Sequence, residues 1–81
     1  SEGEKCLAAP YFETWLGLDV EGAKKSDKDL LVAYQYLALC KYRTTAFADA
    51  VKYADLILAI DPKNEFGKQI KDLGEKEQKK G

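Results

Sequence analysis

The sequence contains no histidine and no methionine, and only two of its 81 residues are cysteines, Cys6 and Cys40. Histidine is the side chain that most often acts as an acid or base near neutral pH and the commonest nitrogen ligand of metals. Two widely separated cysteines lack the paired spacing of a zinc site. There is no glycine-rich phosphate loop, and neither cysteine has a histidine to activate it. We therefore expect a protein that is not an enzyme and that binds no metal or cofactor.

Long apolar runs are also missing, since none approaches the roughly 18 uncharged residues of a membrane-spanning helix. We expect no membrane insertion. The N-terminus lacks the basic and then apolar layout of a signal peptide. Because the chain opens on Ser1-Glu2-Gly3 without methionine, we expect a piece of a longer protein, and the localisation stays open.

A large charge of one sign is likewise absent, because the formal net charge is only −1. Tyr11, Phe12 and Trp15 resemble a base-stacking platform, but the charges near them, such as Glu13 and Asp19, are acidic. A nucleic-acid groove needs basic side chains for the phosphates. We expect no nucleic acid as a partner and assign these aromatic side chains to the core.

The residues that are present predict a single all-α domain over residues 1–81. The chain is 46% hydrophobic and 33% charged, as in ordinary globular proteins. Apolar residues recur at three- and four-residue steps, which is the period of one helix face. The first such stripe predicts a helix over about residues 4–18 and contains Leu7, Ala8, Tyr11, Phe12, Trp15 and Leu16. Pro10 implies either a kink near Cys6 or a helix that starts just before Pro10.

The second predicted helix has two stripes. Its core stripe contains Leu30, Ala33, Tyr34, Leu37 and Ala38, and the helix ends near Arg43. The sequence Ser26-x-x-Asp29 before it resembles a capping box. A mixed apolar, aromatic and polar stripe occupies another face: Val32, Gln35, Tyr36, Leu39, Tyr42 and Arg43. A helix buried on one side does not need this second stripe, so we expect something to cover it.

Two further helices follow. The third has the stripe Phe47, Ala50, Val51, Ala54, Ile57 and Leu58, with Thr44-Thr45 as candidate N-caps and Asp61-Pro62 as its end. The fourth spans about residues 65–77 and is capped by Asn64. It has only Phe66, Ile70 and Leu73 on its apolar side, so we expect partial burial, and the charged run beyond Leu73 should fray.

The stripes together predict the core. Small Ala50 and Ala54 let the third helix approach the second closely. The full set is Leu7, Tyr11, Phe12, Trp15, Leu16, Leu30, Ala33, Tyr34, Leu37, Ala38, Cys40, Phe47, Ala50, Val51, Ala54, Ile57, Leu58 and Ile60. Packing of the first helix on the second could bring Cys6 close to Cys40. We favour two buried free thiols, with a disulfide in an oxidising compartment as the alternative.

The residues from Leu31 to Asn64 resemble a tetratricopeptide repeat, a helical hairpin of 34 residues. Tyr34, Leu37-Ala38, Ala50 and the ending Ile60-Asp61-Pro62-x-Asn64 stand where the family has its aromatic, leucine, small and closing residues. Lys41, Thr45 and Ala54 depart from the pattern, since the family usually has an aromatic, a glycine and an aromatic there. The resemblance implies an antiparallel helical-hairpin repeat of an α-α superhelix, with three to four helices here. The chain looks like the C-terminal segment of longer bacterial proteins of this family.

The resemblance also implies a function. Such repeats bind a peptide or partner helix in the groove lined by the first helix of each repeat. The corresponding residues are Val32, Gln35, Leu39, Tyr42 and Arg43, with Tyr36 alongside, which is almost the second stripe. We expect a non-catalytic protein-binding module. One alternative is that another helix of this chain covers the stripe. The other is that the chain is a purely structural C-terminal end piece of a longer solenoid, whose groove residues pack on upstream repeats or, by self-association, on a second copy in a homodimer. Internal burial of all three of Tyr36, Leu39 and Tyr42 would exclude the groove.

Overall fold

The described residues form four α-helices in the computed structural model, which describes residues 6, 9–17 and 26–80. The helices are α2 (Ala9–Gly17), α3 (Asp27–Arg43), α4 (Phe47–Ile60) and α5 (Glu65–Lys80). The expected all-α class is confirmed. Adjacent helices pack on one another in a compact domain, and α4 contacts both α3 and α5 extensively.

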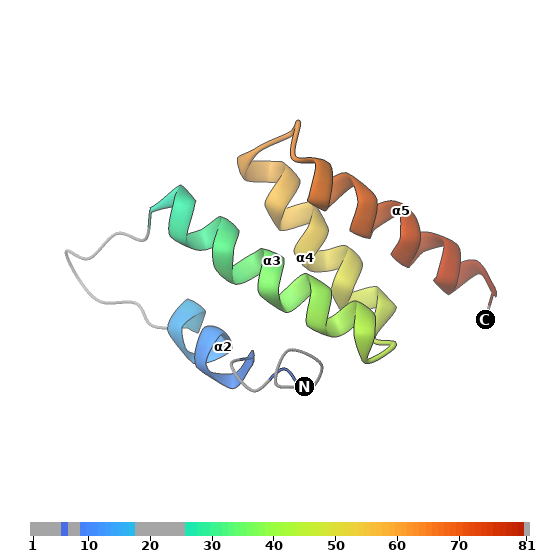
Figure 1. Cartoon of the computed structure of the whole chain (residues 1–81), viewed down its shortest axis with the longest axis horizontal. Helices are drawn as coiled ribbons and strands as arrows, with labels where there is room; N and C mark the ends of the chain where they lie inside the picture. Colours follow the sequence, from blue (N-terminus) through green and yellow to red (C-terminus); the bar gives the residue numbers. More distant parts are fainter. Residues whose placement is uncertain (1–5, 7–8, 18–25, 81) are drawn as a thin grey trace.

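The helices differ in how many neighbours they have. In Figure 1, α3 and α4 run antiparallel as a hairpin, and α5 turns back along α4. A smaller contact joins α5 to α3. By contrast α2 lies beside α3, on the side away from α5, and α3 is the helix that it contacts. The described part of the chain therefore consists of a three-helix unit, α3–α5, with a short helix attached to one side.

Local sequence signals fix the ends of these helices. Ser26 caps α3, since the amide of Asp29 donates to its Oγ at 3.2 Å. Asn64 caps α5 through a 2.8 Å bond from the amide of Gly67 to its Oδ1. Pro62 keeps Asp61 extended, so α4 ends at Ile60. These three predictions are confirmed.

The turn between α3 and α4 differs from the prediction. Thr44 and Thr45 do not cap α4, whose N-cap is Ala46 without a side-chain hydrogen bond. Instead Thr44 is the C-cap of α3, and its single hydroxyl hydrogen is shared between the carbonyl oxygens of Cys40 and Lys41, at Oγ1–O distances of 2.9 and 3.2 Å. Thr45 adopts a positive φ of 65°. A β-branched residue rarely adopts this left-handed conformation, which glycine takes without steric cost.

The first and last helices have bounds other than those expected. α2 begins at Ala9, just before Pro10, and Cys6 ahead of it is a turn residue with a positive φ of 54°. The other residues of the expected helix before Ala9 lie outside the described residues. Proline is tolerated in the first turn because amide hydrogens there have no partner within the helix. At the other end α5 remains helical to Lys80, beyond the expected end at residue 77.

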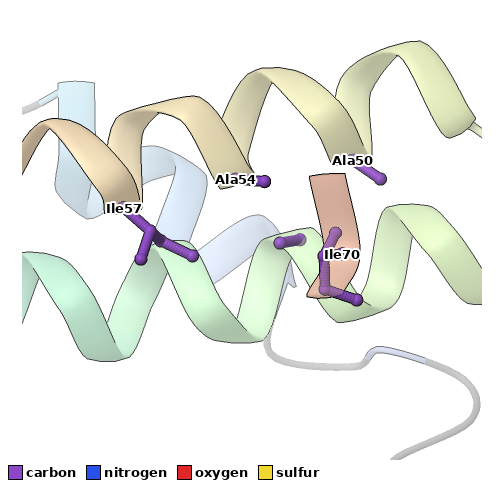
Figure 2. Packing of buried hydrophobic residues seen from close by; sticks show 5 residues of the cluster. Ala50, Ala54, Ile57 and Ile70 are labelled. Carbon is purple, nitrogen blue, oxygen red and sulfur yellow. The ribbon is translucent and has the colours of Figure 1, made fainter. Parts of the chain in front are cut away.

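The hydrophobic core is made by α3, α4 and α5. Its main cluster consists of Ala38, Ala50, Ala54, Ile57 and Ile70. Figure 2 shows the small side chains of Ala50 and Ala54 on α4 together with the larger ones of Ile57 and Ile70. Ile70 is only 4% exposed, while Phe66 and Leu73 are half-buried, so the expected partial burial of this helix is confirmed. Through Ile70, α5 is part of the core cluster.

Two glycines of α5 explain how it packs so closely. A Cβ on Gly67 would lie 3.0 Å from Cγ2 of Ile57, and one on Gly74 would lie 2.7 Å from Cγ2 of Val51. Real Cβ atoms do not approach other atoms as closely as 2.7 Å. Both glycines are buried, and they are seven residues apart, on one face of the helix. Neither glycine belongs to the core that the apolar stripes predict.

The predicted core is confirmed in its centre and wrong at its N-terminal edge. The fully buried members of the predicted set are Ala33, Leu37, Ala38, Cys40, Ala50, Ala54 and Ile57. The half-buried members are Phe12, Trp15, Leu16, Leu30, Tyr34, Phe47, Val51, Leu58 and Ile60. Tyr11 is 68% exposed, and α2 contains no buried residue. Leu7 and Ala8 lie outside the described residues.

Candidate functional site

The six residues of the predicted binding face all lie on α3, but they differ in exposure. Val32 is 53% exposed, and Arg43 near the C-terminus of α3 is exposed as well. Gln35, Tyr36, Leu39 and Tyr42 are half-buried. Internal burial of Tyr36, Leu39 and Tyr42 would exclude a binding groove on this face. None of the three is buried, so the groove is not excluded.

Parts of the chain pack against the middle of this face from two sides. On one side the ring of Tyr36 lies 5.0 Å from the ring of Phe12 on α2. On the other side Leu39 and Tyr42 contact the core cluster, and the Tyr42 ring lies 5.5 Å from Phe47. The six residues therefore do not form one continuous open surface. The part that stays open is the N-terminal end, around Val32.

A hollow of about 250 Å³ lies at this open end, between α2 and α3. Tyr11, Phe12 and Trp15 line it from α2, and Asp29 and Val32 line it from α3. Its wall includes both of the large hydrophobic side chains that are exposed in the described structure, Tyr11 and Val32. An apolar pocket with one carboxylate suits an apolar side chain that has a positive charge near it.

The exposure of Tyr11 has a simple cause. The apolar stripe of α2 is broad, but among the described helices α2 packs on α3 alone, and one helix cannot cover the whole stripe. Phe12 takes the inner position against Tyr36, and Tyr11 packs edge-on against Phe12, with ring centroids 5.5 Å apart. The sequence showed the stripe but not how many helices cover it.

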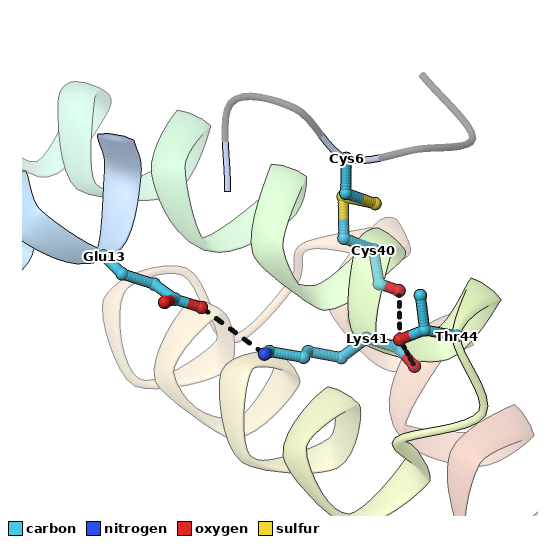
Figure 3. Close-up of polar contacts among 5 residues, drawn as sticks. All are labelled: Cys6, Glu13, Cys40, Lys41 and Thr44. Atoms are coloured by element: carbon cyan, nitrogen blue, oxygen red, sulfur yellow. Dashed lines mark hydrogen bonds and ion pairs between the residues drawn. A yellow bond between two sulfur atoms is a disulfide. The ribbon is translucent and has the colours of Figure 1, made fainter. Parts of the chain in front are cut away.

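A disulfide and an ion pair connect the α2 region to α3. Cys6, just before α2, is bonded to Cys40 of α3, with 5.8 Å between their Cα atoms. This separation is typical of disulfides. Glu13 of α2 pairs with Lys41 of α3 at 3.4 Å, as Figure 3 shows beside the disulfide. The preferred interpretation of two free thiols is therefore wrong, and the alternative pairing is present. A cysteine pair far apart in sequence does not reveal whether the fold brings its Cα atoms together.

The charge of Glu13 on α2 influences the titration of Tyr53 on α4. The pKa of Tyr53 on α4 is raised, first because burial disfavours the phenolate and second because the Glu13 carboxylate is near. Lys41 acts on this pKa in the opposite direction. The titration of Tyr53 therefore responds to the position of α2.

The hollow is lined mainly by apolar contact surface. Its lining has one carboxylate, Asp29, and otherwise aromatic and aliphatic side chains. Within residues 6, 9–17 and 26–80, no group of three or more cysteines, histidines or acidic residues is arranged to hold a metal ion. In the same part of the chain, no helix combines the length and the apolar character needed to cross a membrane.

Comparison of the chain with protein-family models, with curated proteins and with solved structures finds no match. The geometry described above is therefore the basis for assigning a function.

Proposed function

We propose that this chain is a non-catalytic protein-binding module built on a tetratricopeptide-like hairpin of α3 and α4. The observation that carries the proposal is the hollow between α2 and α3, where Tyr11 and Val32 are exposed. Exposed aromatic and aliphatic side chains grouped in a concave site are typical of binding surfaces. The ligand is a peptide or partner helix that inserts an apolar side chain into this hollow.

Several features support the tetratricopeptide-like interpretation. The hairpin ends at Asp61-Pro62, as the repeat motif does, and α5 packs on both of its helices in the manner of a terminal helix. Thr45 stands where the family usually has a glycine, and its φ is positive, as a glycine there would allow. The half-buried Tyr36, Leu39 and Tyr42 shape the wall of the face, and Val32 and Arg43 are its accessible ends.

A selection from a displayed library of random 12-residue peptides on the oxidised full chain tests the proposal. We expect the selected peptides to contain an apolar residue beside a basic one, matching the hollow and Asp29. Trp15 is the only tryptophan of the chain and lines the hollow, so its fluorescence reports binding directly.

Val32→Asp is the decisive variant, because it places a charge in the apolar wall. We expect it to weaken the selected peptide at least about tenfold, which corresponds to about 1.4 kcal/mol. Ala59→Asp introduces the same charge at an exposed position of α4 and should leave the affinity unchanged. Equal affinity for the wild type and Val32→Asp would place the binding surface elsewhere.

The alternative is a structural end piece that stacks on other repeats or on a second copy. The exposed Tyr11 and Val32 also favour this role, because they line the hollow beside α2, the first described helix. This role predicts that the oxidised chain forms a dimer that Val32→Asp dissociates. Sedimentation velocity of both proteins distinguishes the two functions, since a peptide-binding module stays monomeric in both.

A further inference from the structure

α2 is the least secured helix of the described structure. It has nine residues and none of them is buried. Isolated helices shorter than about 12–15 residues are marginal in water. The ion pair between Glu13 and Lys41 has partly exposed side chains at both ends, and such pairs contribute little. α2 therefore depends on its attachment to α3.

The Cys6–Cys40 disulfide supplies a covalent attachment at the N-terminal end of α2. It joins the residue just before the helix to the C-terminal half of α3, while the chain itself leads from the other end of α2 to the start of α3. α2 is thus tethered to α3 at both ends. Opening the disulfide leaves one tether, which lowers the effective concentration of α2 at its docking surface.

The main core cluster does not depend on α2. Its members and the half-buried hydrophobic residues packed against it all belong to α3, α4 and α5. α4 packs extensively on both other helices of the unit. Undocking α2 therefore leaves this cluster intact.

We propose that the Cys6–Cys40 disulfide is a redox gate for the hollow. In the oxidised chain α2 is held against α3 and the hollow is complete. In the reduced chain α2 undocks, and its three lining residues leave, while α3–α5 stays folded. The claim that the disulfide controls binding rests on the proposed function. The claim that α2 undocks on reduction is independent of that function.

The redox step needs a dithiol as reductant. Its thiolate attacks the sulfur of Cys6, which is partly exposed, and the thiolate of Cys40, which is 5% exposed, is the leaving group. The second thiol of the reductant then closes on the mixed disulfide. Two electrons and two protons are transferred, so that Cys6 and Cys40 become thiols and the dithiol becomes a disulfide.

Amide hydrogen exchange on the full chain, with and without dithiothreitol, tests the undocking. We expect amide exchange over residues 9–17 to accelerate at least about tenfold on reduction. The reason is that the Cys6–Cys40 disulfide no longer restrains the opening of α2. Exchange in α4 should change little. Cys6→Ser should behave like the reduced wild type and should not respond to dithiothreitol. Unchanged exchange over 9–17, or equal acceleration in α4, would overturn the gate.

The selected peptide tests the functional part. If reduction leaves about a tenth of the molecules with α2 docked, the apparent Kd rises about tenfold. Undocking with unchanged affinity would overturn the gate while leaving the binding function in place. A peptide that is insensitive to both reduction and Val32→Asp would instead count against the proposed function, and the exchange data would still decide whether α2 undocks.

Discussion

The α3–α5 unit and α2 are both helical, but they are held in different ways. The unit shares a core in which side chains such as Ala54 and Ile57 are fully buried. α2 has no buried residue and is linked to α3 by a disulfide, an ion pair and a ring contact. The comparison shows that a segment can form a helix without being held in place by a buried core. In this domain, the weakly anchored helix also contributes one side of the exposed apolar wall, and Val32 of α3 contributes to the other.

The sharpest way to test this comparison is to truncate one large side chain in each region. Ile57→Ala removes a fully buried side chain and should lower the free energy of unfolding by about 2–5 kcal/mol. Trp15→Ala removes a larger side chain from α2 but should lower the stability of the α3–α5 unit by less than about 1 kcal/mol, because Trp15 is half-buried and lies outside the cluster. Urea denaturation followed by far-UV circular dichroism measures both. Equal losses would mean that α2 belongs to the same cooperative core.

The glycines allow a smaller test of the same contrast. Gly74→Ala should lower the free energy of unfolding by about 1–3 kcal/mol, because the new Cβ collides with Val51 and the overpacking exceeds the gain of about 1 kcal/mol in helix propensity. Val51→Ala should reduce this cost in the double variant. Gly17→Ala meets nothing within 4 Å, so it should only strengthen α2, seen as slower amide exchange over residues 9–17. A stabilising effect of Gly74→Ala would contradict the close approach of α5 to α4.

The centre of the fold could be predicted because its signals are local or periodic. The helical spacing of Leu37, Ala50 and Ile57 indicated which sides face inward, and Ser26 and Asn64 marked helix starts through their capping side chains. Gly67 and Gly74 gave no such signal. A glycine adds nothing to an apolar stripe and weakens a helix, so its value for packing appears only when the neighbouring helix is in place.

The candidate site was predictable only in part, for a related reason. The spacing of residues along the predicted helix indicated that Val32 and Arg43 belong to one face of α3. Which parts of that face stay open depends on where α2 and the core cluster lie, and that is tertiary information. Tyr11 was assigned to the core because its stripe was apolar, yet burial requires enough neighbours to cover the stripe. The cysteine pairing likewise depends on a distance in space.

The pKa of Tyr53 is the smallest expected effect that distinguishes α2 from the α3–α5 unit, because Tyr53 lies on α4 and its pKa depends on Glu13 of α2. Its pKa in the folded state is raised above the ordinary value of 10.0, mainly by burial and then by the Glu13 carboxylate of α2. The corresponding stability is fully present below pH 10 and is lost as the pH rises through the raised pKa. Glu13→Gln should lower this pKa, which can be followed by NMR of the Tyr53 ring with Tyr53→Phe for assignment. Reduction of the disulfide should also lower the pKa of Tyr53, because the undocked α2 carries the Glu13 carboxylate away from the Tyr53 ring. If Glu13→Gln lowers the pKa and reduction does not, α2 stays docked without its disulfide, and the contrast between the two regions is weaker than their burial implies.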